Sequence, residues 1–207
     1  MSGFKFIRHY FGMSGCFKST TIEATLESKL DYNSKVAMWS DIKTWKQYEY
    51  KFGLEKSDLN YAALHLCRLK NYIYDITFPD QIRSILVERG VSDMLFYYYE
   101  KAGKLEKCNG KYVEKFVKEE EILEEQYSYY NPEKILLVQK DTNFIRNVIL
   151  KEPTRAECFP GGVNDYLEQQ DKYIEFTNKY NKITDTIIIE DAEKYIKSLG
   201  LVYNPSK

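Results

Sequence analysis

Residues 12–19 read G-M-S-G-C-F-K-S. The stretch matches the phosphate-binding template G-x-x-x-x-G-K-[ST] at its first glycine, Gly12, and at Lys18 and Ser19. The glycine that normally precedes the lysine is replaced by Phe17. The pattern predicts a P-loop, in which backbone amides surround phosphate groups.

The residues on both sides of this loop predict the strand and the helix that the motif requires. Residues 4–11 are mostly apolar and predict a strand that runs into the loop. After the loop, Ile22 and Leu26 stand four apart, as on one face of a helix. Successive N–H groups and the start of a helix form an anion site. We therefore expect Lys18 to reach the terminal phosphates of ATP and the Ser19 hydroxyl to ligate Mg²⁺.

Phe17, which stands where the template has glycine, restricts how this loop can bind phosphate. Glycine is usual at that position because it tolerates positive φ and leaves room for phosphate. We expect a phenylalanine to serve only if its φ is negative and its ring turns outward, against apolar residues such as Ile22. Two alternatives stay open: a simple turn with a solvated Lys18, and a decayed loop. The residues predicted to bind ATP are Gly12, Ser14, Gly15, Cys16, Phe17, Lys18, Ser19 and Thr20.

Composition narrows the class of protein. The 207 residues, 43% hydrophobic and 29% charged, predict one soluble domain over residues 1–207. The net charge of −1 indicates no general attraction to DNA, although a local basic groove stays open. No run approaches ~18 apolar residues, so we expect no membrane span. Four scattered cysteines and two histidines argue against a zinc site and are typical of a reduced, cytoplasmic protein. A homodimer stays open.

Apolar runs and helical patterns alternate along the rest of the chain. Beyond the first strand, we expect strands at residues 35–39, 84–87, 134–138 and 186–189, and helices at 57–76, 111–126, 166–180 and 192–199. Short, wholly apolar strands are typical of a parallel sheet that is covered on both faces. The pattern predicts a three-layer α/β/α P-loop NTPase fold with a parallel five-stranded sheet.

Charged or polar residues follow three of the predicted strands: Lys18 and Ser19 the first, Asp41 the second, and Glu88 and Arg89 the third. Because ligands bind outside the carboxyl ends of parallel strands, we expect these residues to converge on a phosphoryl-transfer site. Glu88 would hold Mg²⁺ through water, and Arg89 would bind phosphate oxygens with its planar guanidinium. Asp41 would orient or deprotonate an acceptor hydroxyl. The alternatives are a surface ion pair for Glu88 and Arg89, and a helix cap for Asp41.

The order of these motifs resembles the thymidylate kinases and the related deoxynucleoside kinases. Residues 86–92, L-V-E-R-G-V-S, resemble the family's strand that ends in Asp-Arg or Glu-Arg, with a serine a few residues on. Residues 62–68, A-A-L-H-L-C-R, resemble the helix whose arginine holds the acceptor phosphate, so the resemblance assigns that role to Arg68. Alternatively, the aliphatic stem of Arg68 simply covers the core.

The resemblance continues into the C-terminal half of the chain. Residues 135–138 and the pattern Phe159…Val163…Tyr166-Leu167 resemble the strand and the helix that flank the family's arginine-bearing lid. The resemblance therefore implies a short lid segment near residues 146–162. It assigns substrate binding to Arg146 and Arg155, whose alternative role is that of solvated charges.

The resemblance implies an enzyme that transfers the γ-phosphoryl group of ATP to a deoxynucleoside monophosphate, a small, thymidylate-like acceptor. A deoxynucleoside kinase and a kinase that acts on DNA ends or bases are the alternatives within this chemistry. The alternative from another class is a non-catalytic nucleotide-binding protein with a decayed P-loop.

Overall fold

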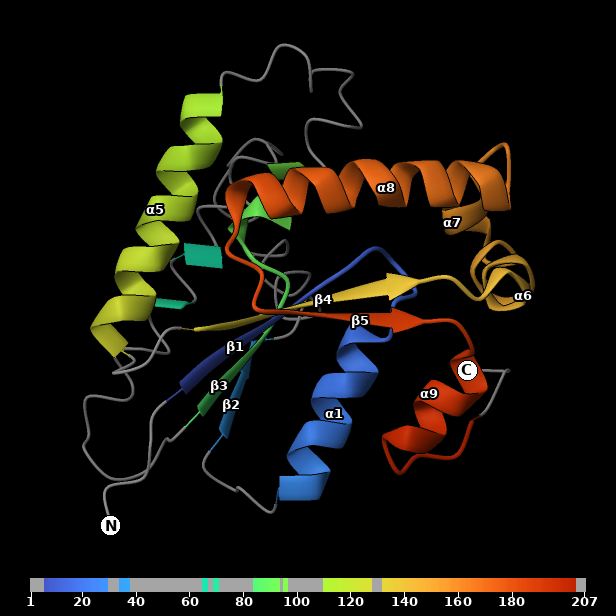
Figure 1. Ribbon diagram of the computed structural model, residues 1–207, viewed down its shortest axis with the longest axis horizontal. Coiled ribbons are helices and arrows are strands. Elements are labelled where there is room, and N and C mark those ends of the chain that lie inside the picture. The colour runs from blue at the N-terminus through green and yellow to red at the C-terminus, as the bar shows by residue number, and fades with distance from the viewer. Residues whose placement is uncertain are drawn as a thin grey trace, which may run out of the picture.

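A parallel sheet forms the centre of the molecule (Figure 1). The structure, a computed structural model, describes residues 6–29, 34–37, 65–66, 69–70, 84–93, 95–96, 110–127 and 132–203. Its strands are β1 (Phe6–Phe11), β2 (Ser34–Ala37), β3 (Ser84–Glu88), β4 (Glu133–Gln139) and β5 (Asp185–Ile189). They form a five-stranded sheet in the order β2-β3-β1-β4-β5, and every neighbouring pair is parallel. The predicted α/β fold with a parallel sheet is confirmed.

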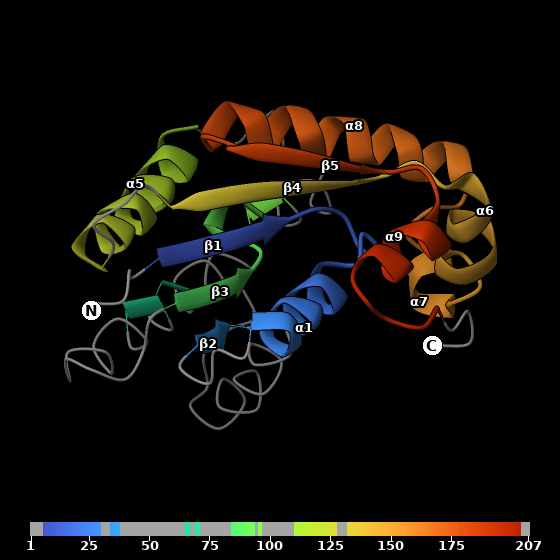
Figure 2. The same ribbon diagram turned by 60° about the horizontal axis from the view of Figure 1, so that its bottom comes forward.

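Helices connect the strands and lie on both sides of the sheet (Figure 2). The longer ones are α1 (Lys18–Lys29), α5 (Gly110–Tyr127), α8 (Val163–Tyr180) and α9 (Ala192–Ser198). Three short helical segments join β4 to α8: α6 (Thr142–Phe144), the π-helix η2 (Ile145–Ile149) and α7 (Pro153–Ala156). Within the described residues, no helix is both long enough and apolar enough to cross a membrane.

The side chains of β1 show which helices cover which face of the sheet. The Tyr10 hydroxyl lies 3.3 Å from the Thr25 hydroxyl of α1. The adjacent residue His9 lies against Glu124 of α5. Because successive side chains of a strand point to opposite faces, α1 and α5 cover opposite faces of the sheet.

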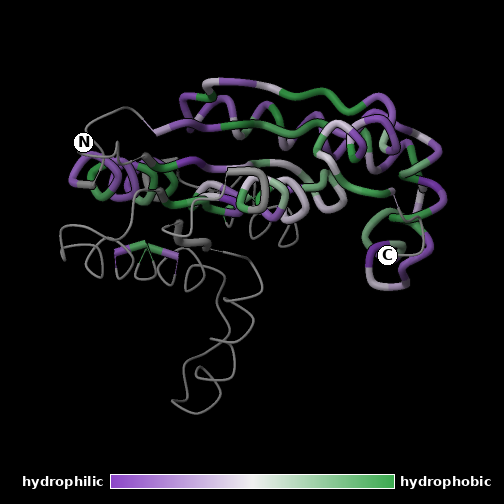
Figure 3. The backbone as a smooth tube through the Cα atoms, turned by 90° about the horizontal axis from the view of Figure 1, so that it is seen from below, coloured by the Kyte–Doolittle hydropathy of each residue, from purple (hydrophilic) through white to green (hydrophobic). Residues whose placement is uncertain are grey.

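Helix α8 buries one side against the sheet. Its buried residues recur three, four and seven apart, as expected of one helical face: Tyr166, Gln170, Tyr173, Phe176 and Thr177. Along the helices the backbone tube changes repeatedly between hydrophobic and hydrophilic (Figure 3). The two tyrosine side chains are fully buried and form part of the core above β1 and β4.

The described elements begin and end close to where the sequence predicts them, with three differences in extent. Helix α8 begins at Val163, three residues before the predicted start at 166. The predicted strand 35–39 is described over Ser34–Ala37. Of the predicted helix 57–76, only residues 65–66 and 69–70 are described.

Strand register brings the two segments with functional motifs together. Strands β1 and β3 are neighbours, and Tyr10 pairs with Glu88 at their carboxyl ends. The loop after β1 and the residues after β3 therefore leave the sheet side by side, as expected for a ligand site at this edge.

Candidate active site

The loop from Gly12 to Phe17 connects β1 to α1, and its two glycines are needed for close approach. Gly12 and Gly15 have φ values of +147° and +87°. A Cβ atom on Gly12 would lie 2.7 Å from the carbonyl oxygen of Leu137, and one on Gly15 would lie 2.2 Å from Cδ1 of Ile149. Neither position has room for a side chain, because Leu137 of β4 and Ile149 of η2 pack directly against the loop.

Phe17 differs from the sequence prediction in its backbone. Its φ is +56°, so the predicted negative φ is wrong. The ring does turn away from the loop, but its partners are Phe144 and Tyr195, with ring centroids 4.7 and 5.9 Å away, rather than Ile22. A left-handed residue other than glycine costs about 1–2 kcal/mol, and this aromatic packing offsets the cost.

The Phe17 carbonyl oxygen also accepts hydrogen bonds from the first turn of α1. It accepts a hydrogen bond from the Thr21 backbone N–H at 2.8 Å and a second from the Thr21 hydroxyl at 2.7 Å. The left-handed turn thus lets the chain enter the helix directly after the loop, with Lys18 as its first residue. Ser14 and Thr20, also predicted to bind phosphate, lie partly exposed on either side of this turn.

Lys18 extends back into the loop. Its Nζ donates hydrogen bonds to the carbonyl oxygens of Gly12 at 2.8 Å and Met13 at 2.7 Å. The residue is 4% exposed. Burial, together with the nearby positive charge of Arg89, lowers the pKa of Lys18 to about 8. The loop therefore holds a buried ammonium group whose charge is only partly compensated by carbonyl dipoles, which is the property that an anion site requires.

Ser19 and Glu88 meet at the same edge. The Ser19 hydroxyl, in the first turn of α1, donates to a Glu88 carboxylate oxygen at 2.9 Å. Glu88 is the last residue of β3 and is 6% exposed. A hydroxyl and a carboxylate at this spacing offer the hard oxygen ligands that Mg²⁺ prefers.

Arg89 follows directly and has a strained backbone. Its φ is +71°, a conformation that costs about 1–3 kcal/mol in a residue other than glycine. Its guanidinium lies 3.6 Å from the buried carboxylate of Asp93, one helical turn later. Burial raises the pKa of Asp93, while the charges of Arg89 and Lys18 oppose that rise. Three charged side chains thus interact within one buried region beside the loop.

Side chains of α8 hold the loop from the opposite side. The Tyr166 hydroxyl donates to the Ser14 carbonyl at 2.9 Å, and the Gly12 N–H donates to the Tyr173 hydroxyl at 2.8 Å. Between them, Gln170 exchanges hydrogen bonds with the backbone of Gln139 at 2.8 and 2.9 Å. Sequence reasoning did not assign these roles. The signal that it passed over is three polar side chains at positions i, i+4 and i+7 of α8, on the face that the helix buries.

Cys16 is oriented toward this helix rather than toward the interior of the loop. Its Sγ lies 3.5 Å from the Tyr166 hydroxyl and donates to Gln170 at 3.7 Å. Burial raises the pKa of the thiol. Cys16 can therefore contact a phosphate through its backbone, whereas its side chain belongs to the packing beneath the loop.

The predicted lid lies against the loop through apolar residues, not through its arginines. Ile149 of the predicted lid lies next to Gly15, and Phe144, just before the lid, packs on Phe17. Arg146 is exposed on η2. Arg155 pairs with Glu152 at 2.9 Å on α7. Among the described residues, neither arginine has a hydrogen bond or ion pair with the loop.

Two further predicted site residues, Asp41 and Arg68, lie outside the residues that the structure describes. The structure therefore brings together Lys18, Ser19, Glu88 and Arg89. The residues predicted to contact the acceptor stay predictions from the sequence.

Comparison with solved structures identifies the fold. Thymidylate kinase from Candida albicans is 14% identical to this chain, with a TM-score of 0.53 over 97% of this chain and 91% of that chain. The chain has the fold of the thymidylate kinases. Thymidylate kinase from Ehrlichia chaffeensis is 11% identical, with a TM-score of 0.49 over 90% of this chain and 88% of that one. The NadR protein in complex with NR is 10% identical, with a TM-score of 0.46 over 95% of this chain and 48% of that one.

Sequence comparisons add nothing to this result, because no protein-family model and no curated protein matches the chain. The resemblance to thymidylate-kinase-like P-loop kinases, predicted from the order of short motifs, is confirmed at the level of the fold.

Proposed function

We propose that this protein is an ATP-dependent nucleotide kinase that transfers the γ-phosphoryl group of ATP to a deoxynucleoside monophosphate. The observation that carries the proposal is the contact between Ser19 and Glu88, 2.9 Å apart, beside the buried ammonium of Lys18. This arrangement combines a cation for phosphate with two oxygen ligands for a metal ion. Phosphoryl transfer needs mainly these components, because positioning and charge neutralisation provide most of the catalysis.

Each residue has a separate role in this proposal. Lys18 exchanges its contacts with the loop carbonyls for contacts with the terminal phosphates. Arg89 binds oxygens of the transferring phosphoryl group, to which its planar guanidinium is suited. Ser19 and Glu88 would hold Mg²⁺, which supplies charge neutralisation at the phosphates when it is bound.

The geometry at Phe17 supports a working loop over a decayed one. Its ring packs on Phe144 and Tyr195, outside the loop, so it does not occupy the space that backbone amides need around phosphate. The two glycines and the hydrogen bonds from α8 also maintain the loop conformation.

The choice of a monophosphate acceptor rests on the thymidylate kinase fold and on Arg68, to which the family resemblance assigns the acceptor phosphate. The experiment is ATP turnover with Mg²⁺ against a panel of deoxynucleosides and their monophosphates. We expect ADP formation with at least one monophosphate, thymidylate first, and none with the nucleosides. Turnover with nucleosides alone would show that the acceptor is a deoxynucleoside and not a monophosphate. No turnover and no ATP binding at all would refute the kinase assignment.

Arg68 gives a second test of the acceptor. Arg68→Ala removes a charge-assisted contact worth about 1.5–3 kcal/mol. It should raise the KM for the monophosphate roughly 10- to 150-fold and leave the KM for ATP nearly unchanged. Equal changes in both KM values would show that Arg68 does not bind the acceptor.

A further inference from the structure

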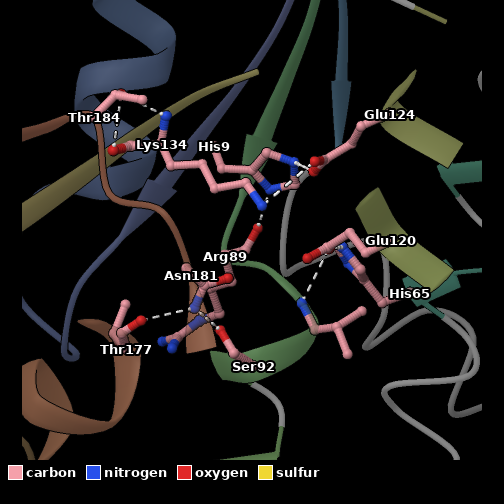
Figure 4. Close-up of polar contacts among 11 residues, drawn as sticks. His9, His65, Arg89, Ser92, Glu120, Glu124, Lys134, Thr177, Asn181 and Thr184 are labelled. Atoms are coloured by element: carbon pink, nitrogen blue, oxygen red, sulfur yellow. Dashed lines mark hydrogen bonds and ion pairs between the residues drawn. The ribbon is translucent and has the colours of Figure 1, made fainter. Parts of the chain in front are cut away.

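A buried group of charged side chains lies beneath the segment that carries Glu88 and Arg89 (Figure 4). We call it the His–Glu network; its members are His9, His65, Glu120, Glu124 and Lys134. It contains both histidines of the chain, and each of its members is at most 2% exposed. The proposed kinase mechanism uses none of these residues.

Each histidine of the network, and its lysine, lies against a carboxylate. His9 Nε2 lies 2.6 Å from Glu124 Oε1, and Lys134 Nζ lies 3.4 Å from the other oxygen of Glu124. One helical turn away on α5, Glu120 Oε1 lies 2.9 Å from His65 Nε2. Because isolated buried charges are costly, such a network persists where its members compensate one another.

Two members also contact the backbone after β3. His9 Nδ1 lies 3.1 Å from the Arg89 carbonyl oxygen, and the Val91 N–H donates to Glu120 Oε1 at 3.1 Å. His9 Nδ1 therefore faces a carbonyl oxygen and Nε2 faces a carboxylate oxygen, and an imidazolium with an N–H on each ring nitrogen matches both. Although burial opposes the charge, Glu124 raises the pKa of His9.

Together with a backbone hydrogen bond to β1, these contacts hold the chain before and after Arg89, the residue with the strained backbone. The Arg89 N–H donates to the Tyr10 carbonyl at 2.9 Å, its own carbonyl accepts from His9, and Val91 is held by Glu120. Between them, a Cβ atom on Gly90 would lie 2.8 Å from the Phe11 ring. Strained backbone conformations persist when the surroundings hold them at several points, as they do here.

We propose that His9 and Glu120 are positioning residues, which hold Arg89 in its left-handed conformation and thereby direct its guanidinium toward the P-loop. The kinetic part of this inference rests on the proposed kinase function. The structural part does not, because the left-handed backbone of Arg89 exists whatever the reaction.

A bound metal ion is the competing explanation of the cluster, since ligand atoms of His9, Glu120 and Glu124 lie within 4.8 Å of one another. The geometry favours a proton. Two ligands of one tetrahedral zinc ion lie about 3.3 Å apart, given metal–ligand distances near ~2.0–2.1 Å, whereas His9 and Glu124 are 2.6 Å apart. Lys134 and protonated His9 already balance the charges of the two glutamates.

The test compares three variants with wild type: His9→Phe, His9→Asn and Lys134→Met. His9→Phe removes the contact with the Arg89 carbonyl and the ion pair with Glu124, while His9→Asn keeps an N–H donor near the Arg89 carbonyl. Lys134→Met is the matched control, because it removes an equally buried charge from Glu124 without touching the segment after β3. Measurements are kcat, the KM for ATP, thermal stability, and hydrogen exchange of the amides of residues 89–91.

For His9→Phe we expect kcat to fall about 10- to 100-fold with little change in the KM for ATP, as for other residues that orient a functional group. Exchange at residues 89–91 should accelerate by a similar factor. His9→Asn should recover most of kcat, and Lys134→Met should lose stability while kcat stays within about threefold. If His9→Phe does not fold, Val91→Pro removes the N–H that Glu120 holds, at a helix start that tolerates proline, and should lower kcat in the same way.

Equal kcat values for His9→Phe (or Val91→Pro) and Lys134→Met would overturn the inference, as would unchanged exchange at residues 89–91. Elemental analysis that finds one zinc or other transition-metal ion per chain in wild type, lost in His9→Phe, would also overturn it. If wild type transfers no phosphoryl group to any acceptor, the kinase proposal fails, and the exchange measurement alone decides the positioning role.

Discussion

The Ser19 hydroxyl donates a hydrogen bond to the Glu88 carboxylate at 2.9 Å, although the two residues lie 69 positions apart in the sequence. The bond joins the first turn of α1 to the end of β3. It brings an alcohol and a carboxylate together beside the phosphate-binding loop, and both side chains are available as oxygen ligands.

Lys18→Ala should abolish most phosphoryl transfer and leave the fold intact. Among the described residues, the Nζ donates hydrogen bonds to the loop carbonyls of Gly12 and Met13, so the mutation removes a charge that we expect to serve phosphate. The loss of a transition-state charge contact costs roughly 3–4 kcal/mol, or a few hundredfold in kcat. Steady-state kinetics and circular dichroism measure the two effects, with the exposed Lys194→Ala as a control. Unchanged turnover would refute the phosphate-binding role of the loop.

Glu88→Gln should weaken the dependence of the reaction on Mg²⁺. The amide retains the shape and accepts the hydrogen bond from Ser19 but loses the charge that a divalent ion needs. We expect a loss of about 10- to 100-fold in kcat/KM at limiting Mg²⁺, because ligand-sphere changes have effects of this size. The measurement is turnover across a Mg²⁺ titration. Glu190, which directly follows β5, provides the matched control as Glu190→Gln; similar losses in both variants would contradict the metal role.

Substitutions at Phe17 should separate backbone strain from aromatic packing. Phe17→Gly relieves the positive φ but loses the contacts with Phe144 and Tyr195. Phe17→Ala loses the contacts and keeps the strain. We expect both to be less stable than wild type by about 1–3 kcal/mol, with glycine the more stable of the two by about 1 kcal/mol. Denaturant unfolding measures the order, and alanine above glycine would contradict it.

Calorimetric titration of ATP·Mg²⁺ into the same proteins tests the alternative of a decayed loop. Because the ring lies outside the loop, wild type and Phe17→Gly should bind ATP with similar affinity. Binding that is absent in wild type and appears in Phe17→Gly would show that the phenylalanine blocks the phosphate site.

ATP binding should take up protons above pH 8. The pKa of Lys18 is about 8 without ligand, and the negative charge of phosphate raises it. At pH 8.5–9 a bound nucleotide therefore recruits a proton to Lys18, and calorimetry in buffers of different ionisation enthalpy should detect it. Lys18→Ala should show no such uptake. Identical binding enthalpies in all buffers for wild type would contradict the prediction.

The same pKa has a consequence for stability without nucleotide. The folded pKa of about 8 lies below the unfolded value of 10.5, so the unfolded chain binds more protons between these values. The free energy of unfolding should therefore rise as the pH increases from about 8 toward 10.5, as far as Lys18 contributes. Wild type compared with Lys18→Ala isolates that contribution.

The sequence by itself determined the parallel α/β architecture, the position of the P-loop and the pairing of Glu88–Arg89 with it. These features depend on contiguous residues: apolar runs long enough for buried strands, a glycine loop before a helix, and charges at strand ends that parallel topology brings to one edge. These features can be predicted from short stretches of sequence, because residues that are neighbours in the chain specify them.

Only the tertiary structure decided how this site is supported. The positive φ of Phe17 depends on Phe144 and Tyr195, and the lowered pKa of Lys18 depends on burial and on Arg89. The hydrogen bonds from α8 to the loop, and those from His9 and Glu120 to the backbone after β3, likewise join residues far apart in the chain. Apart from the spacing of the polar residues on α8, such contacts leave no periodic or spaced pattern in the sequence, because they arise only when separate elements pack against one another.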